Sequence, residues 1–186
     1  MIIAFTGAGI SKESGIDTFQ DRPGIRDYLT RSYAKRYPEK YREVMREFTN
    51  TMIGKEPNDA HRALAEYQIP VITMNVDTLH EAAGTTNITK LHGRLPTEEE
   101  LPYCDTLYNT PVLYEDPAPM YQQAYDLVES LRDGDIFLVI GASEYTSIST
   151  QLRIIARDNG AKIVEIQDNA GTKVRAFLEN HAKESV

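Results

Sequence analysis

The length, composition and charge of this chain exclude several classes of protein. Its 186 residues are 41% hydrophobic and 26% charged, which is ordinary for one globular domain with a hydrophobic core. The formal net charge of −8 at pH 7 argues against non-specific binding to nucleic acid or to anionic membranes, and favours basic partners. No run of residues approaches the length of a membrane span and no charged leader precedes the first apolar residues, so we expect a cytoplasmic protein.

The first predicted element is a buried strand, Ile2–Phe5, that runs into the glycine-rich stretch Gly7–Gly9. A glycine backbone can turn tightly and approach a pyrophosphate, and the amide groups of a following helix would face that anion. Ser11 would cap this helix or bond a phosphate oxygen. An ordinary glycine-rich turn is the alternative, because Lys12 stands where the dinucleotide-binding fingerprint has its third glycine.

Strands and helices alternate along the rest of the chain. Runs of β-branched and apolar residues predict five further strands, Val71–Asn75, Ile88–Leu91, Val112–Tyr114, Ile136–Ile140 and Lys162–Ile166. Apolar residues at steps of three or four predict helices over Pro23–Thr51 (with a second helix starting at Pro38), Asp59–Gln68, Pro117–Arg132, Ser147–Asp158 and Thr172–Ala182. This alternation predicts a Rossmann-like, doubly wound α/β fold, with a mostly parallel sheet and helices on both faces.

Glycine and polar residues follow the predicted strands. Gly7, Asn75, His92, Gly141 and Gln167 all fall just past a strand end. In open α/β sheets, ligands bind at the carboxyl ends of the strands. The sequence therefore predicts that these residues converge on one cleft.

Few side chains are candidates for a nucleophile or a base. The lone cysteine, Cys104, cannot form an internal disulfide or a four-cysteine zinc site, and we expect it to be a small buried side chain. Of the four histidines, His61 and His80 fit packing or capping roles and His181 fits a solvated position near the C-terminus. His92 stands beside a glycine at a strand end, which places it only slightly above His80 as a candidate base.

Six segments, taken in order, form one pattern. They are GAGISKESGIDTFQD (7–21), PNDAHRALAEY (57–67), TMNVDTLHEAAG (73–84), KLHG (90–93), DIFLVIGAS (135–143) and GAKIVEIQ (160–167). This pattern closely resembles the signature of the sirtuin family and covers nearly the whole chain. The resemblance implies a single sirtuin-like domain over residues 1–186 that binds NAD.

The resemblance also implies an activity, which is that of an NAD-dependent protein-lysine deacylase. Such an enzyme cleaves the nicotinamide–ribose bond and transfers the acyl group of an acylated protein or peptide to ADP-ribose. His92 matches the family base that takes a proton from the 3′-hydroxyl of the nicotinamide ribose. Asn75 and Asp77 match residues near the nicotinamide end, where a carboxamide can hold a ribose hydroxyl and a carboxylate can stabilise developing positive charge. A strand-end cap and a turn-forming aspartate are the structural alternatives for these two.

The implied cofactor site runs along the whole edge of the sheet. Phe19 would shield the reactive sugar carbon from water, and Gln167 or Asp168 would face the adenosine ribose. The full set of cofactor-binding candidates is Gly7, Ala8, Gly9, Ser11, Asp17, Phe19, Gln20, Asn75, Asp77, His92, Gly141, Ala142, Ser143, Gln167 and Asp168. With the pyrophosphate over Gly7–Ser11, we expect a bulky residue in place of Gly9 to abolish NAD binding and to leave the fold intact.

Departures from the family pattern leave the acceptor open. Gln20 replaces the arginine of a Phe-Arg pair, and Met74 replaces a glutamine. The short, acidic segment Arg94–Pro111 stands where most sirtuins have a zinc module, so we expect no bound metal. The segment Pro111–Glu115 and the residues after Ser143, which help to line the family's acyl-peptide groove, also differ. NAD hydrolysis or ADP-ribosyl transfer is therefore an alternative, as is a non-catalytic NAD or ADP-ribose sensor, and the oligomeric state stays open.

Overall fold

The computed structural model describes residues 1–17 and 24–184. The centre of this described part is a five-stranded sheet in the order β3-β2-β1-β4-β5, in which all neighbouring strands are parallel. The strands are β1 (Ile2–Thr6), β2 (Val71–Thr73), β3 (Ile88–Lys90), β4 (Ile136–Ile140) and β5 (Lys162–Ile166). The predicted doubly wound, parallel α/β fold is confirmed.

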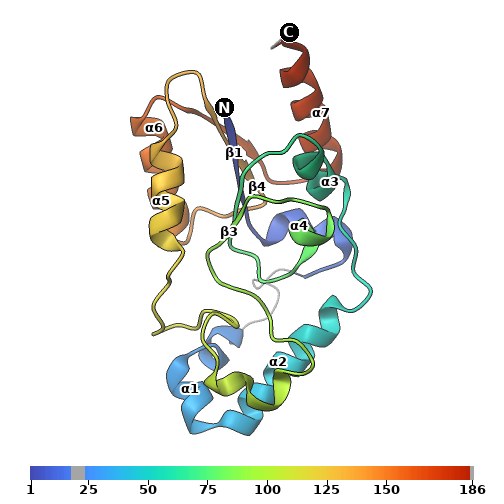
Figure 1. Cartoon of the computed structure of the whole chain (residues 1–186), viewed down its shortest axis with the longest axis vertical. Helices are drawn as coiled ribbons and strands as arrows, with labels where there is room; N and C mark the ends of the chain where they lie inside the picture. Colours follow the sequence, from blue (N-terminus) through green and yellow to red (C-terminus); the bar gives the residue numbers. More distant parts are fainter. Residues whose placement is uncertain (18–23, 185–186) are drawn as a thin grey trace.

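Helices cover both faces of this sheet (Figure 1) because its central strands are apolar on both sides. Successive side chains of a strand point to opposite faces, so Ala4 and Phe5 of β1 enter different cores. Ala4 packs in the core that includes residues of α3 (Asp59–Glu66) and α7 (Ala170–Glu184). Phe5 packs in the core formed with α5 (Tyr121–Glu129) and α6 (Ser147–Asp158).

A smaller group of helices, here called the helical module, lies at one end of the molecule (Figure 1). It consists of η3 (Ile25–Tyr28), α1 (Arg31–Arg36), α2 (Pro38–Met52) and η4 (Leu101–Thr106). These segments share a core separate from the two sheet cores, made of Ala34, Tyr41, Met45, Phe48, Leu101, Cys104 and Leu113. Pro38 occupies the first turn of α2 and Cys104 is buried, as the sequence predicts.

One predicted element is wrong in kind. Val112–Tyr114 is no strand, because its amide groups find partners in two separate loops: Val112 donates to the His92 carbonyl oxygen at 2.9 Å, and Tyr114 donates to that of Leu29 at 2.9 Å. The helix predicted after Gly7 is present as a 3₁₀ helix, η1 (Ala8–Ser14). No side chain caps η1, so of the two alternative roles given for Ser11, the capping role is wrong.

Other boundaries differ from prediction by a few residues. The region predicted as a long helix pair before Thr51 divides into η3, α1 and α2 in its described part, and α5 is shorter than the predicted Pro117–Arg132. A short helix, α4 (Leu79–Ala82), follows β2. A tight turn precedes β4, in which Gly134 has a φ of +86° and the Asp135 amide donates to the Arg132 carbonyl oxygen at 3.0 Å.

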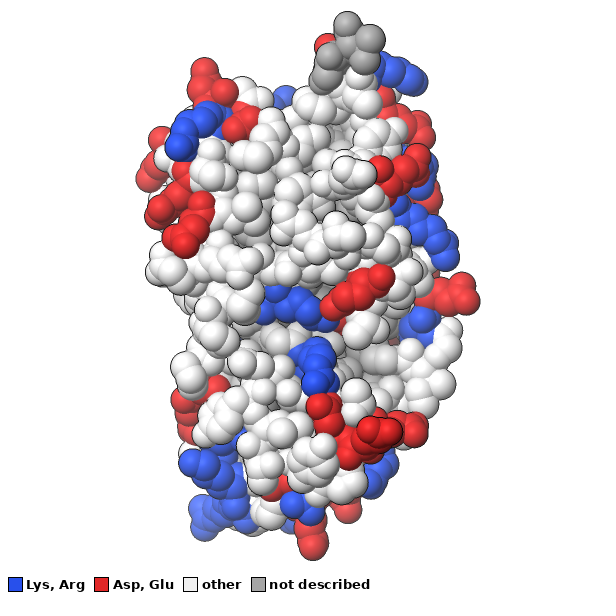
Figure 2. All heavy atoms as spheres, in the orientation of Figure 1, with Lys and Arg blue, Asp and Glu red and all other residues white. Residues whose placement is uncertain are grey.

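Charged side chains of both signs are interspersed over the face drawn in Figure 2. Several charged side chains of the described residues form ion pairs between elements, such as Arg175 of α7, which contacts Asp59 at 2.7 Å and Glu66 at 2.9 Å, both in α3. Partly exposed pairs of this kind contribute little stability each.

One ion pair differs because it is almost completely buried. The guanidinium of Arg31 contacts both carboxylate oxygens of Asp116, at 2.8 and 2.7 Å, and the two side chains are 7% and 2% exposed. Arg31 also donates to the carbonyl oxygens of Asp105 and Leu107, both at 2.8 Å, and lies 4.2 Å from the ring centre of Tyr108. Arg31 therefore connects α1 to the acidic segment Arg94–Pro111, through Asp105 and Leu107, and to the chain that leads into α5, through Asp116.

Replacing Arg31 with alanine should destabilise the protein by about 3–5 kcal/mol, because it removes the positive charge that pairs with the buried Asp116 carboxylate and leaves that carboxylate with only the Leu113 amide as a partner. Urea unfolding followed by circular dichroism measures the loss. Lys173→Ala is the matched control, since it removes the exposed ion pair between Lys173 and Asp168 and should cost at most about 1 kcal/mol. Equal losses in the two variants would contradict the role given to Arg31.

Candidate active site

The loops that follow β1 and β4 meet backbone to backbone at the carboxyl edge of the sheet. These two strands are neighbours where the strand order reverses, which is where such sheets bind ligands. The Gly9 amide donates to the Gly141 carbonyl oxygen at 2.9 Å. A Cβ atom on Gly9 would lie 2.5 Å from the Gly141 Cα, and one on Gly7 would lie 2.6 Å from the Gly141 carbonyl oxygen. Both positions therefore require glycine.

This contact corrects the expectation for Gly9. A side chain at Gly9 would collide with backbone, which cannot move aside as a flexible side chain can. The substitution would disturb the junction of β1 and β4 together with any ligand site there. The expectation that it leaves the fold intact is wrong, so Gly9 variants do not isolate a binding effect.

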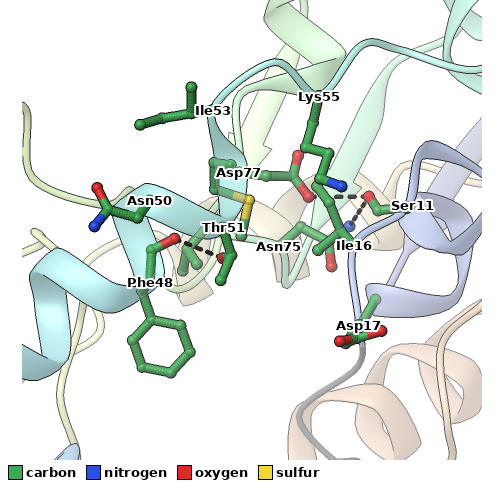
Figure 3. Close-up of a pocket in the computed structure, with 14 residues that line it drawn as sticks. Ser11, Ile16, Asp17, Phe48, Asn50, Thr51, Ile53, Lys55, Asn75 and Asp77 are labelled. Atoms are coloured by element: carbon green, nitrogen blue, oxygen red, sulfur yellow. Dashed lines mark hydrogen bonds between the residues drawn. The ribbon is translucent and has the colours of Figure 1, made fainter.

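Three of the predicted site residues form one buried polar cluster beside this junction (Figure 3). The Ser11 hydroxyl donates to the Asp77 carboxylate at 2.9 Å. The Asn75 amide nitrogen lies 3.1 Å from the Gly7 carbonyl oxygen and 3.3 Å from the Ser11 hydroxyl. Ser11 is fully buried, and Asn75 and Asp77 are each 7% exposed. The spacing of Asn75 and Asp77 thus brings both side chains to Ser11.

Asp77 has a structural role as well as a place in this cluster. One carboxylate oxygen accepts the Leu79 amide at 3.0 Å at the start of α4, which is the turn-forming role expected as an alternative. Burial raises the pKa of Asp77, and the hydrogen bonds from Leu79 and Ser11 oppose that rise because they stabilise the charged form. A buried, hydrogen-bonded carboxylate here can interact strongly with a positive charge that develops nearby.

A pocket of about 370 Å³ opens in front of this cluster, between the sheet and the helical module. Its sheet side includes the predicted residues Ala8, Ser11, Asp17, Asn75 and Asp77. Its other side comes from the end of α2 and the chain after it, with Phe48, Asn50, Thr51, Met52, Ile53 and Lys55. No motif marked this second wall in the sequence.

His92 lies two residues past β3, at the same edge of the sheet. Its Nδ1 atom is 3.1 Å from the Met74 carbonyl oxygen, which can only accept, so Nδ1 carries the proton. Its Nε2 atom is therefore the basic one, and it lies 3.3 Å from the Tyr121 hydroxyl. Burial lowers the pKa of His92, while the bond to Met74 opposes this. His92 is not among the residues that line the pocket. Its ring bonds the Met74 carbonyl oxygen, and Met74 directly precedes Asn75, which does line the pocket.

The packing and capping roles expected of His61 and His80 are confirmed. The two rings pack edge to face with centres 4.9 Å apart. The His61 ring accepts the Asn58 amide at 3.3 Å as part of a capping box at the start of α3, and the His80 Nε2 lies 3.0 Å from the Thr6 hydroxyl. The other ring nitrogens, His61 Nε2 and His80 Nδ1, are buried without a hydrogen-bond partner.

Gly141–Ser143 and Gln167 also lie side by side, past β4 and β5. The Gln167 amide donates to the Ala142 carbonyl oxygen at 3.1 Å, and the Arg153 guanidinium donates to the same oxygen at 3.0 Å. Arg153 is 5% exposed and pairs with Glu165 at 2.8 Å. No sequence motif marks Arg153, because its role depends on contacts that only the fold creates. Asp168, the other candidate past β5, forms an ion pair with Lys173. The candidates Phe19 and Gln20 lie outside the described residues.

Comparison with known proteins shows the family of this chain. Residues 7–120, more than half of the chain, match the model of the Sir2 family. This chain belongs to the Sir2 family. Its membership agrees with the sirtuin pattern found in the sequence.

Similar proteins include named deacylases. An NAD-dependent protein deacylase from Thermococcus sibiricus is 32% identical over 89% of this chain and 79% of its own length. An NAD-dependent protein deacetylase from Bacillus cereus is 31% identical over 90% of this chain and 82% of its own length. The crystal structure of a Sir2 homologue with NAD has a TM-score of 0.84 at 26% identity and covers 98% of this chain and 90% of that protein.

Two kinds of feature are absent from the described residues. Residues 1–17 and 24–184 contain no group of three His, Cys, Asp or Glu side chains placed to hold a metal ion. Within the same residues, no helix is long and apolar enough to cross a membrane.

Elemental analysis tests the prediction that this Sir2-family chain binds no zinc. Protein purified with zinc in the medium should contain far less than one zinc per chain, because one cysteine cannot supply a four-cysteine site. Stoichiometric zinc that survives dialysis would contradict the prediction.

The histidine pair predicts acid sensitivity of the fold. Burial lowers the pKa of His61 to about 4 and that of His80 to about 3, below the unfolded value near 6.5. A lowered pKa of a base means that the unfolded state binds protons first, so this stability is present above pH 6.5 and is lost as the pH falls toward 4.

His61→Gln tests this, because glutamine at the same position can still close the capping box but cannot be protonated. Between pH 7 and pH 5 the wild-type free energy of unfolding should fall by about 2 kcal/mol more than that of His61→Gln. Urea unfolding at the two pH values measures the difference. Parallel losses in the two proteins would show that His61 does not contribute.

Proposed function

We propose that this Sir2-family chain is an NAD-dependent protein-lysine deacylase that cleaves the nicotinamide–ribose bond and transfers the acyl group to ADP-ribose. The deacylase and deacetylase relatives support the proposal. One observation carries it: the buried Ser11–Asn75–Asp77 cluster, the pocket in front of it and the neutral His92 imidazole lie at one edge of one sheet. This edge supplies binding, charge stabilisation and a base together.

The residues at this edge fit a dinucleotide. The turn at Gly7–Gly9 lies where the strand order reverses, which is where such sheets bind dinucleotides, and Ala8 at its centre lines the pocket. The pocket volume of about 370 Å³ falls in the range typical of small-molecule sites. When bound, NAD supplies a sugar carbon that becomes electrophilic as its bond to nicotinamide breaks.

The chain's own residues then have separable roles. Asp77 places a carboxylate where positive charge develops on the sugar, and the Ser11 and Leu79 hydrogen bonds hold it in that orientation. Asn75 presents an amide that can hold a ribose hydroxyl or a water. His92 accepts the proton of the sugar hydroxyl at Nε2, since the bond to Met74 keeps the ring proton on Nδ1.

A three-part assay separates deacylation from its alternatives. Nicotinamide release is measured with NAD alone, then with an acetyl-lysine peptide, and NAD binding is measured by calorimetry. Release that depends on the peptide supports a deacylase, and release without peptide indicates hydrolysis or ADP-ribosyl transfer to the protein. Binding without release indicates a sensor and would overturn the proposal.

Two substitutions assign the residues. His92→Ala should reduce peptide deacylation by about 100- to 10,000-fold, because the base is lost, while Asn75→Ala should reduce both deacylation and simple NAD cleavage. His181→Ala is the control, because His181 lies in α7 near the C-terminus, where its ring stacks on that of Phe177. Full deacylation by a folded His92→Ala protein would show that another group is the base.

The proposal extends to the acyl acceptor and to the location in the cell. The acceptor is an acylated lysine in a protein or peptide, and the net charge of −8 favours basic sequences around it. The reaction is a transferase reaction in its second step, because the acyl group moves to the sugar. A cytoplasmic location completes the proposal, and cell fractionation tests it.

A further inference from the structure

The basic nitrogen of His92 already has a hydrogen-bond partner in this structure. The Tyr121 hydroxyl lies 3.3 Å from His92 Nε2, and the two ring centres are 6.3 Å apart with the planes tilted by 45°. Because the His92 Nδ1 proton is directed at the Met74 carbonyl oxygen, Nε2 offers only a lone pair. The Tyr121 hydroxyl is therefore the donor in this bond.

Tyr121 suits this role by its place in the fold. It is the first residue of α5, so its side chain packs beside the sheet core while its hydroxyl reaches the carboxyl edge. The match to the Sir2 family model ends at residue 120, so that match does not include Tyr121. The nearby ionisable groups that act on Tyr121 are Tyr125 and Tyr114, and burial raises the pKa of Tyr121, which keeps its proton available to donate.

We infer that Tyr121 is a positioning residue that holds the His92 imidazole with Nε2 toward the site and sets its basicity until a substrate hydroxyl replaces the tyrosine. The inference rests on the proposed function of His92 as the base. The bond from Tyr121 stabilises the neutral ring, and the bond from Met74 fixes its tautomer, so the two together hold the imidazole in the form that a base requires. The substrate hydroxyl then donates to Nε2 in place of Tyr121, and Tyr121 keeps its own proton.

The same helix offers a matched control. Tyr125 lies four residues later in α5, and its hydroxyl bonds Gln151 of α6 instead of a histidine. Both tyrosines pack partly buried against the same core, so Tyr121→Phe and Tyr125→Phe each remove one hydroxyl and keep the ring. Similar melting temperatures for the two variants and the wild type would establish that both are folded.

The decisive readout is the pKa of His92, measured by NMR titration of its ring protons in the full chain without NAD or peptide. Tyr121→Phe should raise this pKa by about half to one pH unit, because the neutral ring loses one hydrogen bond, and Tyr125→Phe should not change it. An unchanged His92 pKa in folded Tyr121→Phe, or an equal shift in Tyr125→Phe, would overturn the inference.

Kinetics then test whether the positioning matters for turnover. With an acetyl-lysine peptide, Tyr121→Phe should lower kcat roughly tenfold with little change in the KM for NAD, and should move the acid limb of the kcat/KM profile upward with the pKa of His92. An unchanged kcat and an unmoved acid limb would contradict a positioning role. A shifted His92 pKa in a protein that never turns over peptide would instead contradict the proposed function and leave the Tyr121–His92 bond established.

Discussion

The rest of the structure depends on one close contact between two loops. These are the loops after β1 and β4, which meet where the strand order of the sheet reverses. Gly7 and Gly9 follow β1, and they pack directly on Gly141 after β4 with no room for a Cβ atom. Directly after Gly7, η1 carries Ser11 to Asn75 and Asp77, so the polar cluster lies beside this contact. The fold itself therefore requires these glycines at the edge that holds the site, which explains why substituting them cannot separate stability from binding.

Around this junction, the backbone controls the chemistry of the side chains. The Met74 carbonyl oxygen fixes the tautomer of His92, and the Leu79 amide holds one oxygen of Asp77 while Ser11 holds the other. These partners belong to the chain between β2 and α4 or to η1, so the sheet edge orients each group before a substrate arrives. Preorganised groups of this kind cost little reorganisation during reaction. The helical module completes the site by closing the pocket from the opposite side.

The sequence predicted the sheet and much of its edge because those features are local. A continuous apolar run such as Ile136–Ile140 indicates a strand buried on both faces, and the residues after each strand then share one edge. Contacts between distant segments could not be predicted in this way. Val112–Tyr114 has the composition of a strand but lacks a partner strand, and Arg31, Arg153 and Tyr121 acquire their roles only when the fold brings residues far apart in sequence together.

The most direct test of this account is a crystal structure with an NAD analogue whose nicotinamide bond cannot be cleaved, together with an acetyl-lysine peptide. The account predicts the pyrophosphate at the junction of Gly7 and Gly141, the nicotinamide end beside Asn75 and Asp77, and a ribose hydroxyl within hydrogen-bond distance of His92 Nε2. A cofactor bound elsewhere, or a His92 that stays out of reach of the ribose with the peptide in place, would contradict it.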